Sequence, residues 1–223
     1  MRYAMPVSVT FCLTGGAAVF LDTCRNRYFR LGPRLDADFQ ALAEAGPSAD
    51  LDMGSLVRLG VLQPAADGHG RLNRADAPAP LRSLVEEDLA APRLGARLAP
   101  RVGFAVAVTQ ARLTSSSLAC LVARHRALRQ EAAVGGARPA NGADLYTLSA
   151  SFNRLRRLVP IDTVCLLDSF ALLRFLAGQG HFPQLIMGVR LNPFAAHCWV
   201  QQDDMVLNDA VERASTYTPI LAV

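Results

Sequence analysis

The sequence predicts an α+β fold in two parts: a small winged-helix-like unit, then a larger domain in which a helix packs on an antiparallel sheet. Three observations support this prediction. Short strand-like runs with turn signals fill the first thirty residues, long helical stretches follow a proline-rich break, and further strand-like runs close the chain. Strands and helices that are segregated along the sequence are typical of α+β folds.

Composition limits the function classes. The 223 residues are 51% hydrophobic and 19% charged, so we expect a real core and no wholesale disorder. The net charge is +4, from arginines spread along the chain, which is too weak to hold a nucleic-acid backbone. No CxxC pair occurs, so we expect no metal and no disulfide scaffold. The five cysteines are Cys12, Cys24, Cys120, Cys165 and Cys198.

The sequence also predicts a cytoplasmic protein without a membrane segment. The N-terminus alternates like a strand and lacks the charged-then-apolar pattern of a signal peptide. The longest apolar run near the middle, residues 102–108, is far too short to span a bilayer. Reduced thiols fit this compartment.

The first 75 residues read as a compact unit. Strands are expected at 7–13, 17–22 and 26–31, and the Gly15-Gly16 and Arg25-Asn26 pairs suit tight hairpins between them. A helix should begin at Pro33 and a second should cover 51–59. The runs at 61–64 and 71–73 flank a turn at 66–70 that resembles a small wing hairpin. We therefore assign residues 1–75 to a winged-helix-like domain.

A composition break follows. Residues 76–80 read DAPAP, a linker, and we assign residues 81–223 to the second domain. Its residues 93–131 read as helical, 135–144 as a surface loop and 145–159 as an amphipathic helix. The cluster Arg154, Arg156 and Arg157 is expected on a solvated face near the C-terminus of that last helix.

A cysteine, a histidine and an aspartate then follow in an order that predicts a catalytic site. Pro160 ends the preceding helix, and Asp162 or Thr163 is expected to cap the next, which places Cys165 in its first turn. Backbone N–H groups and the positive end of the helix dipole at that position favour a thiolate and can also bind an oxyanion.

Strands are expected at 182–191, 196–202 and 205–209, so His197 lies 32 residues after Cys165 and Asp209 lies 12 residues further on. On a two-strand hairpin the two side chains could lie side by side, with the carboxylate fixing the imidazole tautomer. The spacing predicts a triad of the transglutaminase or papain type, with Cys165 as nucleophile, His197 as general base and Asp209 as orienting acid.

Each residue alone has a simpler interpretation. A cysteine in an apolar helix is more often a small buried hydrophobe, a lone strand histidine is more often a core residue, and a lone aspartate is more often in a turn. Cys198 neighbours His197 and should point to the opposite face of the strand, so we expect it to pack structurally. The joint order of the three residue types favours the functional interpretation.

These residues also carry a family resemblance. Cys165-Leu166, the block from residue 188 to 200 (GVRLNPFAAHCWV) and Asn208-Asp209 resemble the leader peptidase of lasso-peptide biosynthesis, a bacterial cysteine protease of transglutaminase-like fold. The resemblance covers roughly residues 145–223 and implies the same triad roles. It also implies two partners, a ribosomally made precursor peptide and an ATP-dependent lasso cyclase that resembles asparagine synthetase. No directly bound cofactor is expected, and any ATP dependence would come through the cyclase.

The N-terminal unit is similar to the leader-recognition domains of such pathways, the class shared with the pyrroloquinoline-quinone chaperone, so the chain looks like the fused form of the enzyme. The implied binding mode adds the leader as a strand to the sheet edge. That edge would be residues 26–31, with the helix at 51–59 beside it. The peptide-binding residues would be Arg27, Tyr28, Phe29, Arg30 and Leu56.

The sequence departs from the family pattern at two positions, and two other functions are compatible with it. Papain-like enzymes carry an oxyanion-hole glutamine several residues before the cysteine, and here Val159 stands six residues before it. The basic residue that the family often has before the helix serine is Asp168 here, followed by Ser169. The rival functions are acyl transfer by a transglutaminase or acyltransferase with the same triad, and a non-catalytic scaffold that only binds the leader.

Overall fold

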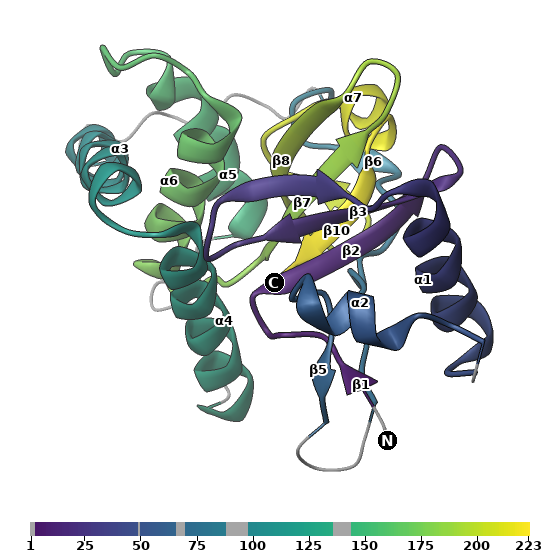
Figure 1. The fold of residues 1–223 in the computed structure, drawn as a ribbon. Coiled ribbons are helices and arrows are strands. Elements are labelled where there is room, and N and C mark those ends of the chain that lie inside the picture. The colour runs from purple at the N-terminus through teal and green to yellow at the C-terminus, as the bar shows by residue number, and fades with distance from the viewer. Residues whose placement is uncertain (1–2, 49, 66–69, 88–97, 136–143) are drawn as a thin grey trace.

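The structure, a computed structural model, describes residues 3–48, 50–65, 70–87, 98–135 and 144–223. It confirms the α+β fold, with a small N-terminal sheet and helices followed by a larger helix-and-sheet part. Figure 1 shows the N-terminal strands crossing the middle of the molecule, between helices α1 and α2 on one side and the C-terminal sheet on the other.

The three N-terminal strands form as expected. Strands β2 (Val9–Thr14), β3 (Ala17–Asp22) and β4 (Arg27–Arg30) make an antiparallel sheet in the order β2-β3-β4. The first hairpin turns at Gly15 and Gly16 and the second at Asn26, all three with positive φ. Glycine adopts this backbone region without steric cost, and asparagine does so more readily than most residues.

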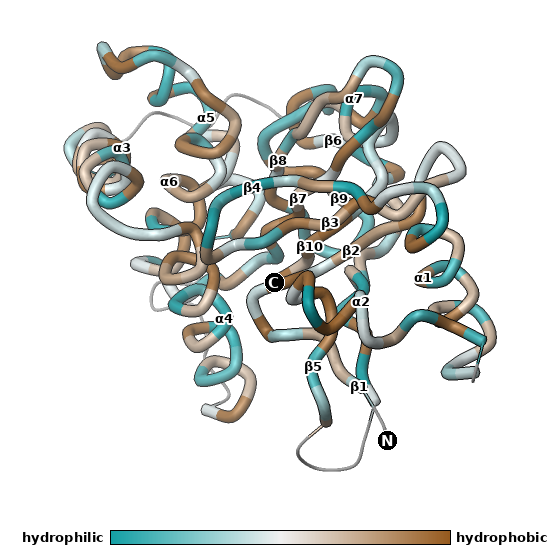
Figure 2. Tube along the Cα trace, in the orientation of Figure 1, coloured by the Kyte–Doolittle hydropathy of each residue, from teal (hydrophilic) through white to brown (hydrophobic). Residues whose placement is uncertain are grey.

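Helices α1 (Pro33–Ala45) and α2 (Met53–Arg58) cover one face of that sheet. Phe39 of α1 meets Phe11 and Phe20 edge to face, with ring centroids 4.9 and 4.7 Å apart. Helix α2 begins after Asp52, whose carboxylate accepts the Ser55 N–H, a common cap. The result is a small aromatic core between the sheet and the two helices. Figure 2 shows the apolar residues along these inward-facing segments.

The expected wing hairpin is wrong. Strand β5 (Gln63–Pro64) pairs with β1 (Tyr3–Ala4) rather than with residues 71–73. Residues 71–73 lie alongside the N-terminal segment instead, where the Asn73 side-chain amide donates to the Pro6 and Val9 carbonyls. The turn residues 66–69 lie outside the described part of the chain.

The larger part begins with helices. The stretch expected as one helical region is two helices, α3 (Leu98–Ser115) and α4 (Leu118–Gly135). They separate at Ser116 and Ser117, and the Ser117 hydroxyl accepts the Cys120 N–H at the start of α4. Helix α5 (Leu145–Arg156) confirms the amphipathic helix, and α6 (Cys165–Ala177) follows it.

Five strands form the C-terminal sheet, in the order β10-β7-β8-β9-β6. The expected strands are β7 (Gln184–Arg190), β8 (Ala195–Gln202) and β9 (Met205–Val206), which pair in antiparallel fashion. The sequence did not predict β6 (Arg82–Ser83), which is parallel to β9, or β10 (Thr218–Ala222), which follows the short helix α7 (Val211–Ser215). Helix α6 packs on β8.

The two parts share a core. Cys12, Val19 and Leu21, on the face of the N-terminal sheet opposite α1, belong to the same buried cluster as α6 and the C-terminal sheet. The Thr218 hydroxyl on β10 donates to the Thr14 hydroxyl on β2 at 2.9 Å. The N-terminal sheet is therefore a layer packed on both faces, which holds the larger part against it.

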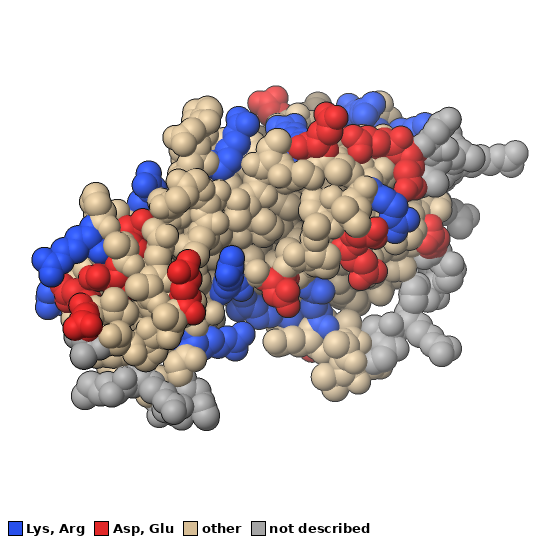
Figure 3. Space-filling view, turned by 90° about the vertical axis from the view of Figure 1, so that its right-hand side faces the viewer, with Lys and Arg blue, Asp and Glu red and all other residues tan. Residues whose placement is uncertain are grey.

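Charged side chains of both signs lie on the face of the molecule that is turned by 90° from Figure 1. Figure 3 shows acidic and basic side chains interspersed on this face. Within the described ranges, no helix has the length and apolar character needed to cross a membrane.

Candidate active site

Cys165 is the first residue of α6. The N-cap is Val164, in extended conformation and without a side-chain hydrogen bond, so the expectation that Asp162 or Thr163 caps the helix is wrong. The Asp162 carbonyl instead accepts a hydrogen bond from Arg156 at 2.9 Å, and residues 162–164 belong to no helix or strand before Cys165. Because no side chain caps the first turn, its N–H groups stay available at the nucleophile.

Strand β8 carries His197, and Asp209 follows β9. The structure brings both to Cys165. His197 Nε2 is hydrogen-bonded to Asp209 Oδ2, and the imidazole also hydrogen-bonds the Cys165 thiol. His197 is 6% exposed, so the pair works in a largely water-excluded position. The three predicted triad residues thus meet as one hydrogen-bonded chain, the arrangement of a nucleophile with its base and orienting acid.

The electrostatics favour the charged form of the pair. The hydrogen bond with His197 lowers the pKa of the Cys165 thiol against the opposing effect of burial, and the N–H groups of Cys198 and Leu166 lower it further. Burial acts to lower the pKa of His197, but its hydrogen bonds to Asp209 and Cys165 outweigh burial and raise that pKa to about 9. A thiolate beside an imidazolium is the nucleophilic state of a cysteine enzyme.

Asp209 is held as a carboxylate. Burial acts to raise its pKa, but the hydrogen bonds from His197 and from the Ala210 N–H bring that pKa below the usual value. Its backbone is anchored as well, because the Ser83 hydroxyl on β6 donates to the Asp209 carbonyl at 2.6 Å. The neighbouring Asn208 side chain accepts the Val200 N–H at 2.8 Å. These bonds fix the carboxylate that orients His197.

Aromatic rings pack on the imidazole. The Trp199 and Tyr217 rings lie 6.0 and 5.1 Å from His197, centroid to centroid. Gly188 lies opposite His197 on β7, and a Cβ there would stand 2.8 Å from Tyr217 Cβ and 3.0 Å from the Trp199 ring. The missing side chain at Gly188 therefore makes room for the two rings that hold His197.

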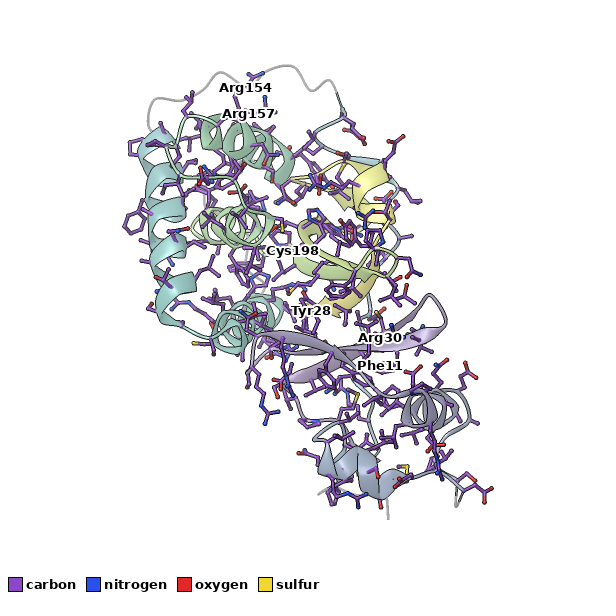
Figure 4. All side chains as sticks on the ribbon, turned by 45° about the horizontal axis from the view of Figure 1, so that its top comes forward. Phe11, Tyr28, Arg30, Arg154, Arg157 and Cys198 are labelled. Atoms are coloured by element: carbon purple, nitrogen blue, oxygen red, sulfur yellow. The ribbon has the colours of Figure 1, made fainter. Side chains whose placement is uncertain are left out.

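A buried ion pair holds the loop before the nucleophile. Arg156, at the end of α5, is 4% exposed, so its expected place on a solvated face is wrong. Its Nε donates to Asp168 at 2.7 Å, and its other nitrogens donate to carbonyls at Val159, Ile161 and Asp162. The unusual Asp168 of the sequence is thus the partner of Arg156. Figure 4 shows the other two residues of the cluster, Arg154 and Arg157, on the outer side of the molecule.

The five residues expected to bind peptide lie in different environments. Arg27 and Arg30 are exposed, and Phe29 is half-buried with its ring stacked 5.1 Å from Phe20. Leu56 is fully buried in the aromatic core, so its side chain supports the sheet and does not line an open groove.

Tyr28 points from the N-terminal sheet towards the larger part. It packs against the shared core, and its ring lies 5.7 Å from that of Phe194, just before β8. Burial, together with the nearby thiols of Cys198, Cys165 and Cys12, raises the pKa of its phenol. Figure 4 shows Tyr28 at the junction, next to Cys198. The expected recognition strand therefore places a side chain near the nucleophile.

The other cysteines differ from Cys165. Cys198 is buried with its thiol 3.8 Å from the Cys165 carbonyl, as its structural role predicted, and burial raises its pKa. Cys12 is also buried, and burial raises its pKa to about 12. Cys24 and Cys120 are exposed. In contrast to the pKa of Cys12 and that of Cys198, the pKa of Cys165 is lowered. Across the described segments, no three His, Cys, Asp or Glu side chains cluster as metal ligands.

Sequence reasoning missed two supporting residues. Ser83 and Tyr217 act through contacts with residues far away in the sequence, and the local pattern carries no signal for them. Gly188 and Asn208 stood inside the motifs that carry the resemblance, which was the available signal for both.

Comparison with known proteins agrees with this geometry. The curated proteins and the solved structures that were compared contain no match to the chain. Residues 119–222, which contain the triad, match the family model described as the transglutaminase-like superfamily. The C-terminal part of this protein is therefore a transglutaminase-like domain, which fits a cysteine protease or acyltransferase in general.

Proposed function

We propose that this protein is a cysteine protease that binds the leader of a ribosomally made lasso precursor peptide and cleaves it off. One observation carries the proposal: a Cys165-His197-Asp209 chain and a candidate leader-binding sheet share one packed core. The match to the transglutaminase-like superfamily supports the chemistry. The resemblance of the Cys-Leu, Gly-Val and Asn-Asp motifs supports the substrate class.

The proposed mechanism begins with the Cys165 thiolate. It attacks the scissile carbonyl, and the oxyanion is stabilised by N–H groups at the start of α6, where the Cys165 N–H has no acceptor within the described residues. The His197 imidazolium then protonates the leaving amine, which departs as the new N-terminus of the core peptide. Water, deprotonated by His197, hydrolyses the acyl-enzyme and releases the leader with a free carboxylate.

Strand β4 is the proposed recognition element. It ends the N-terminal sheet, and within the described part of the chain its outer edge pairs with no other strand. A leader could add there as a further strand through main-chain hydrogen bonds. Because Tyr28 of this strand lies by Phe194 and the nucleophile, a peptide bound to β4 would be held close to the catalytic thiolate.

The released amine places the enzyme ahead of a ring-closing partner. An ATP-dependent lasso cyclase, resembling asparagine synthetase, would join that amine to a carboxyl side chain of the core. In this proposal the peptidase needs no bound cofactor, and ATP is used by the cyclase.

Mass spectrometry of the purified protein with a full-length precursor tests the proposal. We expect free leader and free core, no cleavage of a core peptide that lacks the leader, and a loss on the order of 10⁴-fold for Cys165→Ala. The Cys198→Ala variant is the matched control, since that buried thiol should not be needed for chemistry. Cleavage retained by Cys165→Ala would refute the triad, whereas an isopeptide product would favour acyl transfer.

A further inference from the structure

A second site lies away from the triad. A cavity of about 620 Å³ opens between α3, α4 and the C-terminal half of α6. This volume falls within the range of small-molecule binding pockets. Cys165 begins α6, and the cavity starts at Phe170 and extends to Gln179 beyond the end of that helix. The cavity is therefore separate from the catalytic chain of hydrogen bonds on β8.

The floor of the cavity is apolar. Ala105 of α3, Leu121 of α4, and Phe170 and Leu173 of α6 line it, and all four are buried. At the mouth, Phe104 lines the cavity and is 63% exposed. An exposed phenylalanine that adjoins a concave apolar surface is typical of a binding site.

Four arginines complete the lining. Helix α3 contributes Arg101 and Arg112, α4 contributes Arg124 and α6 contributes Arg174. Among the described residues no Asp or Glu lines the cavity, and none of the four arginines forms an ion pair with another of these residues. The Arg174 guanidinium lies 5.6 Å from the Phe104 ring centroid, over its face. Three helices thus bring unneutralised positive charge to one apolar cavity.

The remaining titratable lining residue adds no charge. His125 of α4 is 5% exposed, and its Nε2 lies 3.0 Å from the Pro183 carbonyl. Burial lowers the pKa of His125 to about 4, so the ring is neutral at neutral pH. Burial, and then repulsion from Arg112 and Arg124, lower the pKa of Arg174. An anion would relieve that repulsion, and a second cation would increase it.

Helix α4 leaves this space open. Its buried side chains (Leu118, Leu121, Val122 and His125) all lie in its first eight residues. The side chain of Leu128, one turn further on, lines the cavity and is half-buried. Beyond His125, α4 therefore contributes the Leu128 side chain to the cavity wall, and that side chain is not fully covered.

We propose that this cavity binds a small organic anion, with an apolar body on the Phe170–Leu173 floor and a carboxylate or phosphate group held by Arg112, Arg124 and Arg174. Guanidinium groups bind both kinds of oxyanion through paired N–H donors. The site is independent of the triad, so the proposal stands apart from the proposed peptidase activity.

Titration calorimetry with four ten-carbon probes tests this site in the full chain, below the concentrations at which each forms micelles. Decanoate and decyl phosphate should bind, while decanol and decyltrimethylammonium should bind at least about tenfold more weakly because they offer the arginines no anion. The ratio of the dissociation constants of decanoate and decyl phosphate identifies the preferred head group. Added salt should weaken the anions' binding and leave that of decanol unchanged.

Paired variants connect the binding to the cavity. The double variant Arg112→Ala/Arg174→Ala should lose decanoate binding at least about tenfold. The matched control Arg154→Ala/Arg157→Ala removes the same charge from exposed arginines outside the cavity and should bind like the parent protein. Thermal unfolding and electrophile labelling of Cys165 show that each variant is folded. Equal binding of decanol and decanoate, no binding of any probe, or an Arg112→Ala/Arg174→Ala variant that binds normally would overturn the proposal.

Discussion

At the scale of single residues, three side chains of the candidate site change each other's protonation. His197 lowers the pKa of the Cys165 thiol, and Asp209 together with Cys165 raises that of His197 to about 9. Between the two values the thiolate and the imidazolium exist together. The sequence allowed these three residues to be grouped as a candidate site, because a helix start, a strand and the segment that follows the next strand bring them together. The expected strand at 205–209 ends at Val206, so Asp209 lies in the segment after it. The sequence could not predict the residues that hold them.

The pH dependence of cleavage follows from these directions. As pH rises, activity should increase when Cys165 loses its proton, which occurs below the usual thiol range, and decrease near pH 9 when His197 loses its proton. In Asp209→Asn the carboxylate that raises the pKa of His197 is gone, so the alkaline limb should move to lower pH. Profiles of kcat/KM with pH measure both limbs. An alkaline limb that stays unmoved in Asp209→Asn would contradict the orienting role.

Substitutions at two separate glycines test whether the packing of Tyr217 and Trp199 holds His197 in place. Gly188→Ala should destabilise the protein by about 1–3 kcal/mol and lower kcat, because its Cβ would meet Tyr217 and Trp199 at 2.8 and 3.0 Å. Gly103→Ala is the matched control. That glycine is inside α3 with nothing within 4 Å of an added Cβ, so the change should stabilise by up to about 1 kcal/mol. Chemical denaturation and steady-state kinetics distinguish the two, and equal stability of both variants would refute the packing argument.

At the scale of helices and strands, the sequence predicted those elements that are encoded by hydrophobic periodicity and by turn residues. The N-terminal hairpins followed from strand alternation and from Gly15-Gly16 and Asn26. Strands β6 and β10 were missed because they are short, two and five residues, and their local sequence does not identify them as strands. They become strands by pairing with β9 and β7, respectively. Arg156 was misplaced because its partner Asp168 lies on the next helix, beyond the reach of a local pattern.

The buried pair of Arg156 and Asp168 should be structurally important. Arg156→Met should cost about 3 kcal/mol or more, since it leaves Asp168 half-buried without its cation and frees the carbonyls of residues 159, 161 and 162. Arg154→Met, on the exposed side of the same helix, should change stability by no more than about 0.5 kcal/mol. Urea unfolding of the two variants measures this difference. A similar small change in both would show that the pair does not hold the loop before Cys165.

At the scale of the whole molecule, the N-terminal sheet serves two cores. Phe11, Phe20 and Phe29 face α1 and α2, whereas Cys12, Leu21 and Tyr28 face the larger part. The sequence predicted two units, because each has its own composition and its own elements. It could not predict that the units share a sheet face, since strand alternation does not say what covers each face. The proposed recognition sheet and the candidate active site are accordingly joined by packed side chains.

Tyr28 tests this connection. Tyr28→Ala should lower kcat/KM for a full-length precursor on the order of tenfold or more, because the proposed recognition strand loses its contact with Phe194, just before β8. Labelling of Cys165 by a small electrophile should change little, since the triad stays intact. Arg30→Ala, on the exposed end of the same strand, should leave the Phe194 contact in place. If Tyr28→Ala slowed labelling and cleavage equally, a general loss of structure would explain the effect.

In the proposed function, a thiolate at Cys165 removes a leader peptide by hydrolysis, and mass spectrometry of the reaction with a full-length precursor in ¹⁸O-labelled water distinguishes this from acyl transfer. We expect the released leader to carry one heavy oxygen in its new C-terminal carboxylate and the core to begin with a free amine. Both products should be absent with Cys165→Ala. A leader joined to another amine, or labelled leader released by Cys165→Ala, would contradict the proposed function.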